Sequence, residues 1–104
     1  MTETDLRANL RDLADLFERY GVGFWAQTMR KKSEFIVADC ELLRSLKSMF
    51  GGMGSLTDCY ITPENGHRVT RDEQRSVNEK LDQLTTQLYL TIKQLKTDFG
   101  CDGF

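Results

Sequence analysis

The sequence has little of several residue types on which common functional sites depend. Its 104 residues include one histidine, one proline and one tryptophan. A single histidine cannot form a metal site alone, and the sequence contains no Cys-x-x-Cys pair and no carboxylate–histidine spacing that would complete one. We therefore expect neither a bound metal nor a cofactor.

The chain also lacks a long hydrophobic run and a strong excess of charge. No stretch approaches the roughly 18 apolar residues of a membrane span, and the polar start Met1-Thr2-Glu3-Thr4-Asp5 does not resemble a secretory signal. The formal net charge is −2. The dense basic run Arg30-Lys31-Lys32 is more typical of a helix C-terminus than of a phosphate-binding face. We expect a cytoplasmic protein that binds neither membrane nor nucleic acid.

Cysteine is present in an odd number, as Cys40, Cys59 and Cys101. The wide spacings between them are not those of a disulfide framework. We interpret all three as buried or partly buried thiols in a reducing compartment. The alternative is a reactive thiol, for which Cys101 near the C-terminus is the best candidate.

Apolar residues do recur at helical spacing in four segments of the chain. The length and the 39% of hydrophobic residues indicate one domain, residues 1–104. The expected fold class is mainly α, with about four helices in a single small bundle-like domain. The helices are expected near residues 4–20, 24–34, 40–50 and 71–99, with irregular structure over 51–70.

Capping residues support these helix starts. Thr2 or Thr4 precedes the first helix and Asp39 the third, and Thr70 with Glu73 forms a capping box before the fourth. The fourth helix is longer than a domain of this size needs, so part of its apolar stripe is expected to meet a partner or a second copy.

Two short segments leave alternatives open. Phe35-Ile36-Val37 either finishes the second helix or forms an extended link. Residues 59–61 and 67–69 either pair as a short β-hairpin or remain irregular, because turn signals lie between them.

The most unusual feature is the glycine-rich run Phe50-Gly51-Gly52-Met53-Gly54-Ser55. It follows a helix rather than a strand and lacks the lysine of a phosphate-binding loop, and Thr57 stands where a dinucleotide pattern requires glycine. We interpret the run first as a turn that ends the third helix. Its alternative role is a rigid edge, beside Trp25, that binds a partner or a small anion.

The side chains around this run have similar alternatives. Ser55 and Asp58 are expected to tie the loop by bonds to backbone amides. Ser55 or Cys59 with Asp58 and His67 also supplies the residue types of a nucleophilic triad, although such a set is common by chance. No catalytic residue is assigned. The candidate partner-binding residues are Trp25, Met53, Ser55, Asp58 and Tyr60.

The segments Leu16-Phe17-Glu18-Arg19-Tyr20-Gly21 and Phe24-Trp25, followed by the glycine-rich run, Leu56 and Asp58, resemble a family of small bacterial proteins of unassigned function. That family shares the tryptophan and a Phe-Gly-Gly-Met-Gly-Ser-x-x-Asp loop, and the resemblance covers about the first 58 residues. This chain departs at Thr57, where the family pattern has asparagine. The resemblance implies a bacterial accessory protein, of the kind found as immunity partners beside toxins.

Three function classes follow. The first is a small protein-binding module, a bacterial immunity protein that neutralises a basic toxin domain, with acidic groups such as Asp12, Asp15 and Glu18, or Asp72 and Glu73, guiding the encounter. The second is a structural or regulatory homodimer that pairs through the long C-terminal helix. The third is an enzyme or anion binder that uses the glycine-rich loop.

Overall fold

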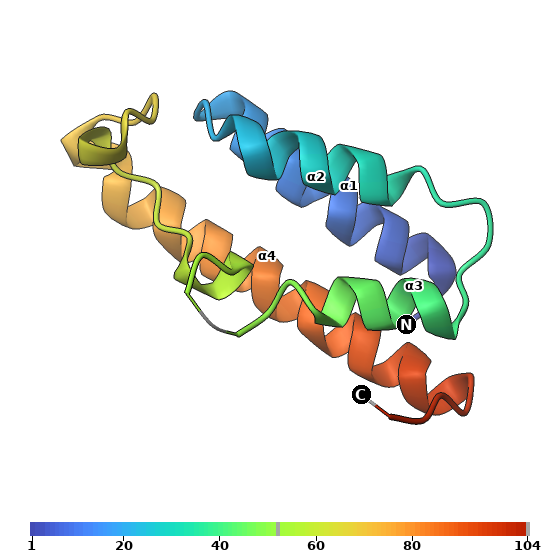
Figure 1. Cartoon of the computed structure of the whole chain (residues 1–104). Coiled ribbons are helices and arrows are strands. Elements are labelled where there is room, and N and C mark those ends of the chain that lie inside the picture. Colours follow the sequence, from blue (N-terminus) through green and yellow to red (C-terminus); the bar gives the residue numbers. More distant parts are fainter. Residues whose placement is uncertain (52, 104) are drawn as a thin grey trace.

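Four α-helices and two short 3-10 turns account for most of the chain (Figure 1). The computed structural model describes residues 1–51 and 53–103. The mainly α fold class is confirmed, and the described residues contain no β-strand. The elements are α1 (Glu3–Arg19), α2 (Gly23–Ser33), α3 (Cys40–Lys47), η1 (Leu56–Asp58), η2 (Pro63–Asn65) and α4 (Arg71–Asp98).

The expected caps form at three of the four helix starts. Thr2, rather than Thr4, caps α1 through a capping box with Asp5. The carboxylate of Asp39 accepts a hydrogen bond from the Leu42 amide of α3 at 2.8 Å, and Thr70 with Glu73 forms the capping box of α4. Each of these bonds satisfies an amide that has no partner within its own helix.

The helices form two pairs that meet along α1 and α4. Figure 1 shows α1 and α2 antiparallel on one side of the molecule, and α3 lying along the C-terminal half of α4 on the other. Helix α1 packs on both α2 and α4. Its inward face is fully buried at Leu6, Leu10, Leu13 and Phe17, four positions at the spacing of one helix face.

The apolar stripe of α4 is covered within the chain. The buried residues of α4 recur along one side of the helix, and Phe99 just after its end is exposed. They are Val77, Leu81, Leu84, Leu88, Thr91, Ile92 and Leu95. Helix α3 covers one part of α4, and the segment after η1 covers another, where the buried Ile61 bonds to Asn78. A 28-residue helix is about 42 Å long, which matches the longest dimension of the molecule, 44 Å.

The suggested β-hairpin between residues 59–61 and 67–69 does not form. The Asn78 side chain of α4 takes the place of a partner strand at Ile61. Its Oδ1 accepts from the Ile61 amide at 2.8 Å, and its Nδ2 donates to the Ile61 carbonyl at 2.7 Å. Because both backbone groups of this buried residue are satisfied by α4, no strand pairing is needed.

The two remaining boundaries are settled by turns. Helix α2 ends at Ser33, so Phe35-Ile36-Val37 is a link outside the helix, and Ile36 is 93% exposed. Helix α3 ends at Lys47, three residues before the expected end, because Met49 and Phe50 donate to carbonyls three residues back in a turn. Gly51 follows with a φ of 86°, a conformation that favours glycine.

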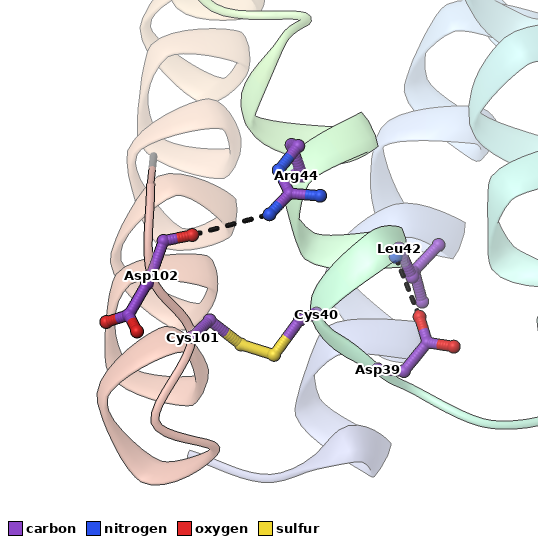
Figure 2. Close-up of a disulfide and its surroundings, with 6 residues drawn as sticks. All are labelled: Asp39, Cys40, Leu42, Arg44, Cys101 and Asp102. Atoms are coloured by element: carbon purple, nitrogen blue, oxygen red, sulfur yellow. Dashed lines mark hydrogen bonds between the residues drawn. A yellow bond between two sulfur atoms is a disulfide. The ribbon is translucent and has the colours of Figure 1, made fainter.

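A disulfide between Cys40 and Cys101 corrects the expectation of three thiols (Figure 2). It joins the first residue of α3 to the segment after α4, with 5.6 Å between the two Cα atoms. Gly100, at a φ of 66°, reverses the chain after α4, and the Cys101 amide then donates to the Lys96 carbonyl. This turn brings Cys101 back to α3, so the alternative of a reactive Cys101 thiol is wrong as well. Cys59 alone keeps its thiol.

No helix in the described part of the chain combines the length and the apolar character that a membrane crossing requires.

Candidate functional site

The loop after α3 is held in shape by its own polar side chains. The Gly51 amide donates to the Thr57 hydroxyl at 3.3 Å, and the Gly54 amide donates to the Asp58 carboxylate at 3.0 Å. The hydroxyls of Ser55 and Thr57 lie 2.8 Å apart and share a hydrogen bond. The expected tie from Asp58 to a loop amide is therefore confirmed, whereas Ser55 bonds to a side chain. Gly52 lies outside the described residues.

Met53 and Tyr60 carry the exposed apolar surface of this segment. Met53 is 97% exposed and Tyr60 is 50% exposed. Between them Leu56 is buried at the start of η1, and its amide donates to the Met49 carbonyl at 2.8 Å. The buried leucine and the loop hydrogen bonds hold a backbone from which Met53 projects into solvent.

A cavity of about 300 Å³ separates this segment from α4. Tyr60 is the one expected site residue that lines it, and its hydroxyl lies 3.4 Å from the amide nitrogen of Gln74. The wall includes the carboxylate of Asp82, which is exposed. The lining residues are Leu56, Thr57, Cys59, Tyr60, Asn78, Leu81, Asp82 and Thr85.

The residue types of a nucleophilic triad are engaged in separate turns. The Cys59 thiol is half-buried, and this burial raises its pKa, which disfavours the reactive thiolate. His67 accepts a hydrogen bond from the Thr62 amide at Nδ1, at 3.2 Å, so it closes the turn around η2. The Asp58 carboxylate accepts from Gly54. Cys59 and His67 thus each belong to a separate local structure.

Trp25 lies apart from the other four candidate residues. It belongs to the first turn of α2, and its ring packs at 6.5 Å from Phe17 of α1 and edge-on at 5.1 Å from Phe24. Figure 1 shows α2 packed beside α1, whereas η1 lies along α4. Met53, Ser55, Asp58 and Tyr60 therefore belong to the one segment that follows α3, whereas Trp25 packs against Phe17 of α1.

The acidic residues of α1 are partly neutralised by the basic end of α2. Arg30 forms ion pairs of 2.8 Å with both Asp15 and Glu18. The hydrogen bond that Arg30 donates to Asp15 first, and then the one it donates to Glu18, raise the pKa of Arg30. The run that contains Arg30 occupies the last turn of α2, as expected. Of the second acidic group, Glu73 is used in the capping box of α4.

Within residues 1–51 and 53–103, no three His, Cys, Asp or Glu side chains gather in a way that could hold a metal ion.

Residues 18–70, just over half of the chain, match the family model described as a domain of unknown function (DUF6966). The chain belongs to this family. The DUF6966 match runs from the end of α1 to the residue before α4, so it includes Trp25 and the whole segment from Met53 to Tyr60. No curated protein and no solved structure matches the chain.

Proposed function

We propose that this DUF6966 protein is a small protein-binding module. Its contact surface would be the Met53–Tyr60 face, made by Met53, Ser55, Asp58 and Tyr60. The observation that carries the proposal is a nearly fully exposed Met53 on a loop fixed by hydrogen bonds at Gly51 and Gly54. A rigid loop loses little conformational entropy on binding, so burying Met53 and Tyr60 against a partner is favourable.

The charge on this face favours a basic partner. Asp58 is exposed two residues before Tyr60, and the exposed Asp82 lines the cavity with Tyr60. Asp15 and Glu18 of α1, by contrast, are already paired with Arg30. Exposed carboxylates accelerate the encounter with a positively charged surface. In this proposal the partner is a basic toxin domain, and the protein is a bacterial immunity protein that neutralises it.

The disulfide bears on where the protein acts. The sequence favours the cytoplasm, but disulfides persist mainly in oxidising compartments, and the structure joins Cys40 to Cys101. We infer that the protein works in a compartment that keeps this bond oxidised. Trapping thiols in intact host cells tests the location, because a cytoplasmic protein would show all three cysteines alkylated.

A homodimer through residues 73–99 has less support from the packing. The apolar stripe that suggested it is covered by α3 and by the segment around Ile61. A molar mass of about 24 kDa in light scattering, twice the chain mass of 12.0 kDa, would nevertheless establish it.

The decisive experiment measures binding to the product of the neighbouring gene in the native host. Isothermal titration calorimetry with the purified pair is expected to give a specific complex. Met53→Ser is expected to weaken it by about tenfold or more, because methionine burial at the interface is lost. Ile36→Ser is the matched control, since Ile36 is 93% exposed on a different segment.

The two variants distinguish the outcomes. Equal affinity for wild type and Met53→Ser, with a complex present, would move the interface away from the Met53–Tyr60 face. No complex with the neighbouring product would remove the immunity proposal itself.

A further inference from the structure

The backbone between η1 and α4 is anchored on both sides of a tight turn. Before the turn, both backbone groups of Ile61 bond to the Asn78 side chain of α4. After the turn, the Arg68 amide donates at 2.8 Å to a carbonyl at the end of α1. Residues 62–67 therefore form a short loop between two fixed points, one on each helix.

One imidazole nitrogen closes this loop. The amide of the buried Thr62 donates to Nδ1 of His67 at 3.2 Å, and the Thr62 carbonyl accepts from the Asn65 amide at 3.1 Å. The Asn65 side chain also donates to the Tyr60 carbonyl, at 3.4 Å. The loop that His67 closes thus also holds the backbone of Tyr60, which belongs to the Met53–Tyr60 face.

The adjacent amides of Ile61 and Thr62 use different kinds of acceptor. The Ile61 amide bonds to an amide oxygen, which accepts whatever the pH. The Thr62 amide bonds to an imidazole nitrogen, which accepts only while it carries no proton. His67 is the one histidine of the chain, and histidine is the side chain that gains a proton as the pH falls from about 8 to about 5.

Other charged and titratable groups stand next to the loop. They are Glu18, Arg19 and Tyr20 at the end of α1, Tyr60, Glu64 and Arg68 in the segment itself, and Arg71, Asp72 and Glu73 at the start of α4. Glu18, Glu64 and Glu73 each already accept a hydrogen bond from another residue. Hydrogen bonds from the Thr62 hydroxyl and then from Arg71 lower the pKa of Glu64 to about 2, so Glu64 stays charged where histidine titrates.

We propose that protonation of His67 switches the Met53–Tyr60 face to a more weakly binding state. The proposal rests on the function proposed above for that face. The imidazole takes a proton from water at Nδ1 and becomes an imidazolium with two N–H donors, so a donor then faces the Thr62 amide. That buried amide is left without an acceptor, the loop opens, and Asn65 no longer holds the Tyr60 carbonyl. The added positive charge also disfavours a basic partner.

Amide hydrogen exchange of the oxidised protein, expressed as protection relative to free peptide rates, tests the switch without a partner. From about pH 8 to about pH 5, the protection of the Thr62 amide is expected to fall by about tenfold. The adjacent Ile61 amide should keep its protection, because its acceptor does not titrate. Unchanged protection at Thr62 would overturn the proposal, and so would an equal loss at both amides, which would show general unfolding.

Two variants separate the proton from the acceptor. In His67→Asn the side-chain oxygen supplies an acceptor that does not titrate, so the protection of the Thr62 amide should be the same at both pH values. In His67→Ala no acceptor is present, so this amide should be poorly protected at both. Protection of the Ile61 amide reports that each variant is folded. A pH response in His67→Asn as large as that of the wild type would assign the titration to another group and overturn the proposal.

Binding to the product of the neighbouring gene tests the control of the face. The dissociation constant of the wild type is expected to rise by about tenfold from about pH 8 to about pH 5, and that of His67→Asn is expected to rise far less. An equal rise in the two proteins would overturn the control of the face by His67. If no complex forms at either pH, the function proposed for the face is lost, whereas the exchange of the Thr62 amide still decides for or against the opening of the loop.

Discussion

The α1–α2 pair and the α3–α4 pair are held together in different ways. Helices α1 and α2 are joined by a short turn and pack through a continuous apolar face, with Arg30 bridging their polar edges. Helices α3 and α4 are separated by a long irregular segment and are joined by the Cys40–Cys101 disulfide. Packing suffices where helices are adjacent in sequence, whereas pairing across a long loop costs more entropy and is reinforced covalently here.

The largest expected effect is the loss of stability when the disulfide of the α3–α4 pair is removed. Cys40→Ser with Cys101→Ser removes a link between residues 61 positions apart, and loop-closure entropy predicts a loss of about 4 kcal/mol in the free energy of unfolding. Urea denaturation measures the loss, and hydrogen exchange should show faster opening of α3 than of α1. The control Cys59→Ser should change the stability little. Equal protection of α3 in the double variant would show that packing alone holds this pair.

The α1–α2 pair, which is held by packing, should lose stability when a cavity is made in its apolar core. Leu13→Ala removes a fully buried side chain from α1 and is expected to lower the free energy of unfolding by about 3 kcal/mol. Leu90→Ala, at a residue 45% exposed on α4, should cost far less. The midpoints of urea unfolding of the two variants measure this difference. Similar losses at both positions would contradict the placement of Leu13 in the core.

The irregular segment between the two pairs depends on Asn78. Asn78→Ala leaves the amide and carbonyl of the buried Ile61 without their side-chain partners. The expected cost is about 2 kcal/mol, since unsatisfied buried polar groups are destabilising. Asn78→Asp keeps the acceptor and loses the donor, so it should retain protection of the Ile61 amide in hydrogen exchange. Unchanged exchange at Ile61 in the alanine variant would contradict this role.

The smallest effect is expected from the exposed Glu64. Hydrogen bonds from the Thr62 hydroxyl and then from Arg71 lower the pKa of Glu64 to about 2, from an ordinary value of 4.5. Because the folded-state pKa is lowered, this stabilisation is present above about pH 4.5 and is lost as the pH falls toward 2. Glu64→Gln should flatten that part of the stability curve. Added salt should weaken the effect, because the ion pair is exposed.

Local patterns predicted the parts of the fold that local forces determine. The helix starts at Asp39 and Thr70 follow from capping chemistry within three residues, and the apolar stripes of α1 and α4 follow from helical spacing. The disulfide could not be predicted, because only the tertiary fold brings Cys101 to Cys40. The hairpin prediction was wrong for the same reason. The Asn78 side chain, which bonds to the Ile61 backbone, lies 17 residues further along the chain.

The candidate site was predicted in part. Met53, Ser55, Asp58 and Tyr60 are adjacent in sequence and stay together in one segment, but Trp25 belongs to the α1–α2 pair.

The link between Cys40 and Cys101 also changes the topology of the chain. It closes α3, both 3-10 turns and α4 into one covalent ring, and it leaves α1 and α2 as a linear arm. A single protease cut within the ring opens it but leaves the chain covalently in one piece, whereas a cut within the arm divides it into two covalently separate pieces. The Met53–Tyr60 face belongs to the ring, so one backbone break beside it would leave the chain in one piece.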